Sequence, residues 1–351
     1  MTRFLDSKLK KLVAYTPGEQ PKNMSELIKL NTNESPFPPA PGVIDMIKSE
    51  EVEKLRLYSD PDCKQLVSTI AEYHHISEHQ VFPGNGSDEV LAFIFHGLCP
   101  NGAAFADITY GFYPVFAEMF DAIQQIVPLR DDFSIKVEDY AGINGTVFIA
   151  NPNAPTGLCL PLSDIETLVS QNRDRLVVVD EAYIDYGGVS AQSLLDTFDN
   201  LLVVRTLSKS RSLAGGRVGY ALGSEELIKD LNTMKFSFNP YNVNRLSIIA
   251  GAEAMKDTSY FNECCAKIIE NREFTTDELR KLGFDVLPSK ANFIFAGANP
   301  KISGIDYFSK LRDNGILVRH FNSPRICDYV RITIGTMEQM RRLVQVTKEV
   351  L

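Results

Sequence analysis

Cysteine is scarce in this chain, and its few positions are scattered. The six cysteines lie at positions 63, 99, 159, 264, 265 and 327, with one adjacent pair and no Cys-x-x-Cys spacing. Structural zinc sites and disulfide frameworks both rely on regular cysteine spacings. The sequence therefore predicts neither, and we expect the cysteines to be reduced and structural.

Long apolar runs and basic clusters are also absent. No segment approaches the roughly 20 apolar residues that cross a membrane. The opening segment MTRFLDSKLKKLV mixes apolar and charged residues, which favours an amphipathic helix over a signal peptide. The formal net charge is −9 and no lysine- or arginine-rich block occurs, so nucleic acid and anionic membranes are not expected partners. These features predict a cytoplasmic protein that binds small molecules.

Histidine offers no metal site either. Among the five histidines, His75 and His79 have the spacing of one helix face but lack the glutamate of a His-Glu-x-x-His motif. A surface position is the better interpretation, and no metal is expected.

The chain does have the composition of an ordinary globular protein, with 44% hydrophobic and 23% charged residues. A length of 351 residues exceeds the size at which one core keeps growing, which predicts a large domain with a smaller companion.

Short apolar runs alternate with helical patterns through the middle of the chain, which predicts an α/β fold with a mainly parallel sheet. The runs are Ala103 to Ile108, Thr146 to Ala150, Leu176 to Val179 and Leu201 to Val204. Polar residues follow each run. Because ligands bind outside the carboxyl ends of strands in open parallel sheets, these polar clusters are expected to face one site.

From about Asn244 the pattern changes to long helices, Leu246 to Met255 and on to Leu282. Strand-like segments follow at Ala291 to Ala296, Ile316 to Arg319 and Tyr329 to Ile334, and a closing helix begins at Met337. This order predicts an α+β second domain. We expect an N-terminal arm at 1–35 that contributes to the small domain, a large domain at 36–245 and the small domain at 246–351.

Lys209 is the first candidate for chemistry, because it follows a buried strand and precedes the glycine-rich segment before Arg217. A lysine amine attacks carbonyl groups when desolvation or a neighbouring cation lowers its pKa, and Arg217 is a candidate for that cation. Taken alone, the segment fits an ordinary solvated lysine better.

Asp180 ends the apolar run Leu176 to Val179, where a buried carboxylate requires a partner. A protonated pyridine nitrogen is one such partner, and Tyr183 is placed to donate a hydrogen bond to a phenolate oxygen on the same ring. A helix cap or a metal ligand are the alternatives for Asp180.

Two turns complete the set of motifs. The segment from Gly84 to Glu89 precedes an apolar helical pattern, and a glycine-rich helix start favours a phosphate, although for this segment alone a plain capping turn with Ser87 or Asp88 as the cap is the better interpretation. The segment from Asn151 to Gly157, NPNAPTG, is a rigid turn whose asparagines can meet a ligand oxygen.

In this order, the four motifs resemble those of fold type I aminotransferases, and most closely the histidinol-phosphate aminotransferase family. Further matches are AYTPG at 14–18, LNTNE at 30–34, GSDE at 86–89 and VRITIG at 330–335. The resemblance extends over nearly the whole chain. It implies a pyridoxal-phosphate-dependent enzyme, a homodimer, and transamination of histidinol phosphate with 2-oxoglutarate in histidine biosynthesis.

The resemblance also assigns roles to individual residues. Lys209 holds the cofactor covalently, while Asp180 and Tyr183 act on its ring nitrogen and hydroxyl. The remaining cofactor-binding residues are Gly86, Ser87, Asp88, Tyr110, Asn153, Thr206, Ser208 and Arg217, together with Tyr58, which the family sends into its neighbour's site. The substrate-binding residues are Tyr15, Asn33, Arg319 and Arg331. One departure is Ala154, where the family commonly has asparagine, so Asn153 either substitutes for it or leaves the ring hydroxyl to Tyr183.

Three other functions share these features. A decarboxylase of phosphothreonine-like substrates uses the same lysine, aspartate and arginine. An aromatic aminotransferase would use Tyr15 and phenylalanines as a ring pocket. A catalytically silent binding module on this fold is disfavoured by the joint presence of Lys209, Asp180 and Arg217.

Overall fold

The computed structural model describes residues 9, 12–20, 27–47, 49–297 and 299–351. The helix expected in the first thirteen residues falls almost wholly outside the described residues. No helix in the described ranges is long and apolar enough to cross a membrane.

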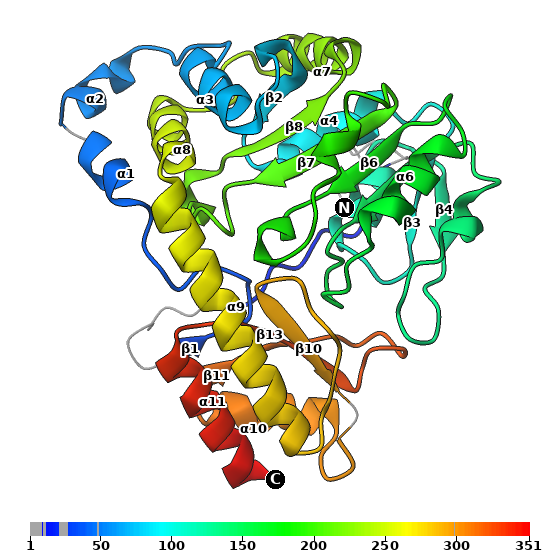
Figure 1. Ribbon diagram of the computed structural model, residues 1–351, viewed down its shortest axis with the longest axis vertical. Coiled ribbons are helices and arrows are strands. Elements are labelled where there is room, and N and C mark those ends of the chain that lie inside the picture. The colour runs from blue at the N-terminus through cyan, green and yellow to red at the C-terminus, as the bar shows by residue number, and fades with distance from the viewer. Residues whose placement is uncertain (1–8, 10–11, 21–26, 48, 298) are drawn as a thin grey trace.

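A seven-stranded sheet forms the larger part of the molecule, with strand order β2-β8-β7-β6-β5-β3-β4 (Figure 1). Its strands are β2 (Val81–Gly84), β3 (Ala103–Ala106), β4 (Gln124–Val127), β5 (Thr146–Ala150), β6 (Val177–Asp180), β7 (Leu201–Thr206) and β8 (Gly219–Gly223). Strands β3 to β7 run parallel, whereas β8 is antiparallel to both of its neighbours. The predicted α/β fold with a mainly parallel sheet is therefore confirmed.

Alternate residues of the central strands enter two different hydrophobic cores. Val177 and Val179 of β6 pack with one core, while Val178 between them packs with the other. This follows from the strand period of two, which sends successive side chains to opposite faces. The first core includes α3 (Lys64–His74), α6 (Leu162–Ser170) and α8 (Arg245–Lys256), and the second includes α4 (Ser87–Gly97), α5 (Phe112–Met119) and α7 (Glu225–Phe238). Helices thus cover both faces of the sheet.

The smaller part is built on an antiparallel sheet of order β12-β13-β10-β9. Its strands are β9 (Asp285–Val286), β10 (Phe293–Gly297), β12 (Arg319–His320) and β13 (Tyr329–Thr333). A separate core joins this sheet to α9 (Thr258–Lys281), α10 (Gly304–Asp313) and α11 (Met337–Val350). Helix α9 runs from the larger part into the smaller one (Figure 1).

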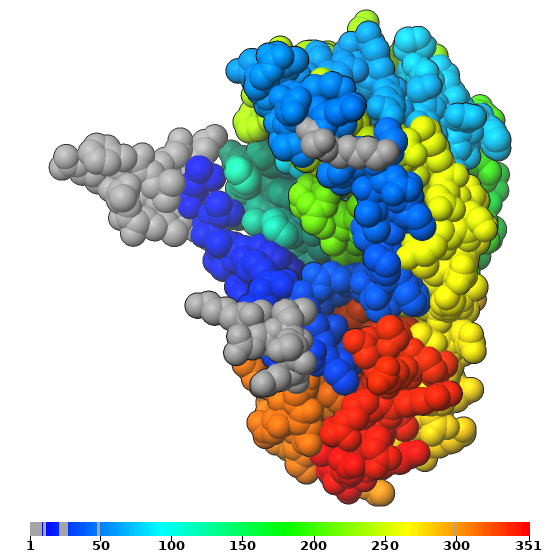
Figure 2. Space-filling view, turned by 90° about the vertical axis from the view of Figure 1, so that its left-hand side faces the viewer, coloured from blue at the N-terminus to red at the C-terminus, as the bar shows by residue number. Residues whose placement is uncertain are grey.

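The N-terminal segment lies across the boundary between the two parts (Figure 2). Its short strand β1 (Ile28–Lys29) pairs in parallel with β11 (Ile316–Leu317) of the smaller part. After β1 the segment continues into α1 (Pro41–Met46), α2 (Ser49–Glu53) and the 3₁₀ turn at Lys54–Arg56. Further 3₁₀ turns lie at Glu78–Gln80, Val137–Tyr140, Ile184–Tyr186, Ala191–Leu194 and Ala214–Gly216.

Candidate active site

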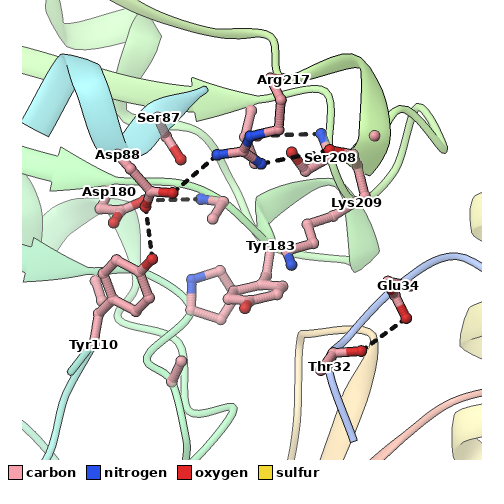
Figure 3. Close-up of a pocket in the computed structure, with 17 residues that line it drawn as sticks. Thr32, Glu34, Ser87, Asp88, Tyr110, Asp180, Tyr183, Ser208, Lys209 and Arg217 are labelled. Carbon is pink, nitrogen blue, oxygen red and sulfur yellow. Dashed lines mark hydrogen bonds and ion pairs between the residues drawn. The ribbon is translucent and has the colours of Figure 1, made fainter. Parts of the chain in front are cut away.

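The carboxyl ends of β5, β6 and β7 open onto one cavity of about 350 Å³ (Figure 3). Sheet residues at its wall include Ala150, Asp180 and Thr206, and the N-terminal segment contributes Thr32 and Glu34. Polar residues that follow three of the four predicted runs, among them Tyr110, Asp180 and Lys209, therefore line one cavity, whereas the asparagines of the turn after β5 do not.

Lys209 lies in this cavity, three residues beyond the end of β7. The turn that carries it is fixed by the Ser208 backbone N–H, which donates to Thr206 Oγ1 at 3.1 Å, and both residues are buried. Within the described part of the chain, the Lys209 amine has no hydrogen bond or ion pair, and Nζ lies 5.8 Å from the centre of the Tyr183 ring. A primary amine thus faces the cavity with no hydrogen bond to the described residues (Figure 3).

Asp180 ends β6 at the cavity wall and is 6% exposed. Its carboxylate accepts hydrogen bonds from the Tyr113 hydroxyl at 3.0 Å and from the Ala182 backbone N–H at 3.2 Å. No lysine or arginine of the described residues forms an ion pair with it. Burial raises the pKa of Asp180 to about 6, because the charged form loses hydration that these two donors only partly replace. A cation at this position would complete the site.

Tyr113 is a site residue that the sequence analysis missed. It is fully buried on α5, three residues after Tyr110, and packs edge-on against the Tyr110 ring at 5.7 Å. In the sequence it has the appearance of a core residue in an apolar helix, so no pattern identified it.

The start of α4 forms a second wall of the cavity. Gly86 caps the helix with a positive φ of 82°, and Ser87 and Asp88 occupy its first turn. A Cβ on Gly86 would lie 2.5 Å from Nη2 of Arg217, so only glycine permits this approach. Backbone N–H groups at a helix start, with Ser87 and a guanidinium beside them, form an anion site. The alternative of Ser87 or Asp88 as the helix cap is not what the structure shows.

Asp88 links two of the predicted residues to this wall. Its carboxylate accepts from Arg217 at 3.0 Å and from the Tyr110 hydroxyl at 2.7 Å (Figure 3). Burial and the adjacent Asp88 charge raise the pKa of Tyr110 well above its usual range, so the phenol stays protonated. Arg217 therefore has Asp88 as its partner, and the structure shows no contact between Arg217 and the Lys209 amine.

The turn at 151–157 uses its asparagines internally. Asn153 Nδ2 donates to the Ile108 carbonyl and to Thr156 Oγ1, while its Oδ1 accepts from Thr109. All of its donors are occupied, and the cavity wall is formed instead by Pro152 and Ala154. Of the two possibilities raised by Ala154, the geometry favours reliance on Tyr183.

A second cavity of about 440 Å³ adjoins the first and shares Lys209, Tyr110 and Tyr183 with it. Arg319 and Arg331 line this cavity and lie directly opposite each other in the β12–β13 ladder. Like charges opposite each other are unfavourable in a sheet. Neither guanidinium forms an ion pair with an acidic residue of the described chain, and Arg331 Nε is buried without a partner. The pair is arranged to receive an anion.

The other two predicted substrate-binding residues, Tyr15 and Asn33, both line this cavity. Tyr15 lines the cavity and stacks on Phe112 with ring centres 4.2 Å apart. Asn33 also lines it, but its side chain is engaged with Tyr183 and Thr333. Tyr58 lies outside both cavities, 80% exposed, and stacks on Tyr241.

Comparison with known proteins agrees with this geometry. The family model described as aminotransferase class I and II matches residues 25–346. The chain belongs to the class I and II aminotransferases.

Individual relatives narrow the relationship. The histidinol-phosphate aminotransferase of Clostridium botulinum (strain Langeland) is 48% identical over 100% of this chain and 99% of its own length. That of Brachyspira hyodysenteriae is 49% identical with the same coverage. The histidinol-phosphate aminotransferase structure from Sinorhizobium meliloti, in complex with pyridoxal 5′-phosphate, has a TM-score of 0.87 and 24% identity, covering 100% of this chain and 98% of that one.

These findings confirm several predictions made from the motifs. The resemblance to the histidinol-phosphate aminotransferase family is confirmed, as are the fold type I architecture and the assignment as an aminotransferase. Aminotransferases of this family depend on pyridoxal phosphate, and the related structure contains it.

Proposed function

We propose that this aminotransferase binds pyridoxal phosphate in the 350 Å³ cavity and transfers an amino group between histidinol phosphate and 2-oxoglutarate. Three observations fit the cofactor. Among the described residues, Asp180 is a buried carboxylate that forms no ion pair and Lys209 is an amine that forms no hydrogen bond or ion pair, and the α4 start with Arg217 is suited to an anion. These correspond to the pyridine nitrogen, the aldehyde and the phosphate of the cofactor.

Each residue then has a defined task. Lys209 would hold the cofactor at its aldehyde carbon and would carry a proton to and from the substrate. Asp180 would keep a proton on the ring nitrogen, while Tyr183 would donate to the ring hydroxyl oxygen. Ser87, Ser208, Thr206 and Arg217 would hold the phosphate, and Asp88, which accepts from both Arg217 and Tyr110, keeps Arg217 in place. The cofactor itself supplies an electron sink for the bond that breaks at the substrate carbon.

The arginine pair carries the substrate assignment. Arg331 and Arg319 have no acidic partners in the described chain, and their cavity adjoins the Lys209 amine. Glutamate presents a carboxylate, and histidinol phosphate presents a larger phosphate, which a guanidinium binds in the same planar geometry. The relatives that share about half of their residues with this chain are named for histidinol phosphate.

The exposed apolar surface near Tyr58 supports a homodimer. Leu55, Leu57, Tyr58, Phe238 and Tyr241 are each between 41% and 80% exposed, although all are apolar or aromatic. Exposed apolar patches mark interaction sites, and the Tyr58 and Tyr241 rings stack here with centres 4.5 Å apart. A second copy of the chain packed here would cover these residues and bring Tyr58 to its site. We also propose that the enzyme acts in the cytoplasm.

The direct test is product analysis with purified enzyme. Histidinol phosphate and 2-oxoglutarate should give glutamate and imidazole-acetol phosphate, with phosphothreonine, phenylalanine and histidine as competing substrates. Carbon dioxide released from phosphothreonine would indicate a decarboxylase, and faster turnover of phenylalanine would indicate an aromatic aminotransferase.

A further inference from the structure

Asn33 makes an unusual set of contacts for a residue expected to bind substrate. It is 1% exposed and has a left-handed backbone, with φ of 56°. Its side-chain Nδ2 donates to the Tyr183 hydroxyl at 3.1 Å, and its Oδ1 accepts from Thr333 Oγ1 at 2.9 Å. The side chain therefore links the N-terminal segment, the smaller sheet and the cofactor cavity.

The hydrogen bonds of this chain all run toward Tyr183. The Thr333 hydroxyl accepts the Asn33 backbone N–H at 3.0 Å, so its own proton is free for Asn33 Oδ1. Asn33 Oδ1 faces Thr333, and its Nδ2 donates to the Tyr183 hydroxyl. A tyrosine hydroxyl has one proton to donate, and here one acceptor position of its oxygen is filled by Nδ2.

The consequence lies at the Tyr183 hydroxyl. Because its oxygen already accepts from Asn33, its proton is directed elsewhere, and the cavity is the open direction. No other side chain on the adjoining wall competes for this role, since Pro152 and Ala154 have no side-chain donor and the Asn153 donors are used within the turn.

We propose that Asn33 is a positioning residue that orients the Tyr183 hydroxyl as a hydrogen-bond donor toward the phenolic oxygen of the cofactor. Thr333, Asn33 and Tyr183 form a chain in which every donor points toward the cavity, and aligned donors strengthen one another. This inference rests on the proposed binding of pyridoxal phosphate.

A measurable property of the loaded enzyme follows. In the loaded enzyme, the Lys209 nitrogen would be bonded to the aldehyde carbon of the cofactor. The phenolic oxygen would bear more negative charge after this nitrogen has lost its proton. A donated hydrogen bond stabilises that form and so lowers the pKa of the nitrogen. Removing the orienting amide should therefore raise this pKa, which is read directly from the visible absorbance of the cofactor.

The test is a spectroscopic pH titration of cofactor-loaded variants. Glycine accepts the positive φ at position 33, so Asn33→Gly removes the amide without backbone strain. We expect its absorbance midpoint to rise by about 0.5 to 1 pH unit, and Tyr183→Phe to raise it at least as far. In the Tyr183→Phe background, Asn33→Gly should add no further shift, because its effect passes through the hydroxyl.

Asn292→Ala is the matched control. Asn292 Nδ2 donates to the Asn33 backbone carbonyl at 3.0 Å, so this variant loosens the same segment without touching the chain to Tyr183. Its midpoint should stay at the wild-type value. If Asn33→Gly does not fold, Asn33→Asp is the second variant, since a carboxylate would draw the Tyr183 proton to itself and also raise the midpoint.

The outcomes are distinguishable. An unshifted midpoint in Asn33→Gly, or an equal shift with and without the Tyr183 hydroxyl, would overturn the positioning role while leaving the cofactor assignment intact. A wild-type enzyme that takes up no pyridoxal phosphate, and so shows no cofactor band at any pH, would overturn the proposed function itself.

Discussion

Asp180 and Arg331 are both charged residues whose burial is unfavourable unless a ligand completes their surroundings. For Asp180 the effect of burial depends on pH. Its folded-state pKa of about 6 lies above the ordinary value of 3.8, so the folded protein binds this proton more tightly than the unfolded chain does. The contribution of Asp180 to stability is therefore lost as pH rises from about 4 to about 6.

We predict that Asp180→Asn stabilises the cofactor-free protein relative to wild type, and more at pH 7 than at pH 4. The difference in unfolding free energy should grow by up to about 3 kcal/mol over this range, because each pKa unit corresponds to about 1.4 kcal/mol. Urea denaturation at several pH values measures it. Parallel stability profiles for the two proteins would contradict the buried, unpaired state of Asp180.

Lys209→Ala should abolish turnover while the fold survives, because one amine both binds the cofactor and carries the proton. Loss of the proton-transfer role alone removes about 10²- to 10⁴-fold in rate. Borohydride reduction of the cofactor-loaded wild-type enzyme, followed by peptide mapping, should place the label on Lys209. A label on another lysine would disprove the assignment.

Arg319→Ala should discriminate between the two amino donors. A charge-assisted hydrogen bond contributes roughly 1.5–3 kcal/mol, so kcat/KM for histidinol phosphate should fall by about 10- to 150-fold. Glutamate should lose less, since its smaller carboxylate is held mainly by Arg331. Separate half-reactions with each donor measure this, and equal losses would assign Arg319 a structural role.

At the level of single residues, sequence reasoning identified those that end strands. Lys209 and Asp180 follow apolar runs that predict β7 and β6. Because these strands pair in parallel, both residues lie at the same edge of the sheet. Tyr113 was missed because a tyrosine in an apolar helix is indistinguishable from core. The internal bonding of Asn153 depends on Ile108, which is distant in sequence.

Among the structural elements, the start of α4 depends most strongly on a single residue, Gly86. We predict that Gly86→Ala weakens cofactor binding by about tenfold, because the new methyl group displaces Arg217 and the backbone at φ 82° and ψ 161° is one that only glycine adopts without strain. Gly142→Ala is the control, since its Cβ would meet nothing within 4 Å. Fluorescence titration of the cofactor-free proteins measures both affinities, and equal values would contradict a cofactor phosphate at this helix.

The elements also show where sequence patterns are insufficient. The glycine-rich β8 is antiparallel in a mainly parallel sheet, and neither the strand nor its direction was predicted. Helix α8 packs in the core of the larger part through Ile248, Ala254 and Met255, although the sequence changes to a pattern of long helices just before it. We therefore propose that the domain boundary lies between α8 and α9 rather than at residue 245. The sequence pattern placed it earlier because apolar periodicity does not show which core a helix enters.

For the whole molecule, we predict a dimer with shared active sites. Tyr58→Ala and Lys209→Ala, each inactive alone, should recover up to about a quarter of wild-type activity when mixed and refolded, because half of the dimers contain one intact site. Sedimentation should show a dimer. If Tyr58 acts within its own subunit, no activity returns.

A single turnover of the cofactor-loaded enzyme with histidinol phosphate alone shows whether this compound is the amino donor. We expect stoichiometric conversion of the aldehyde form of the cofactor to its amine form, and restoration of the aldehyde spectrum by 2-oxoglutarate. A spectrum that histidinol phosphate leaves unchanged, while another amino donor converts it, would contradict the assigned substrate.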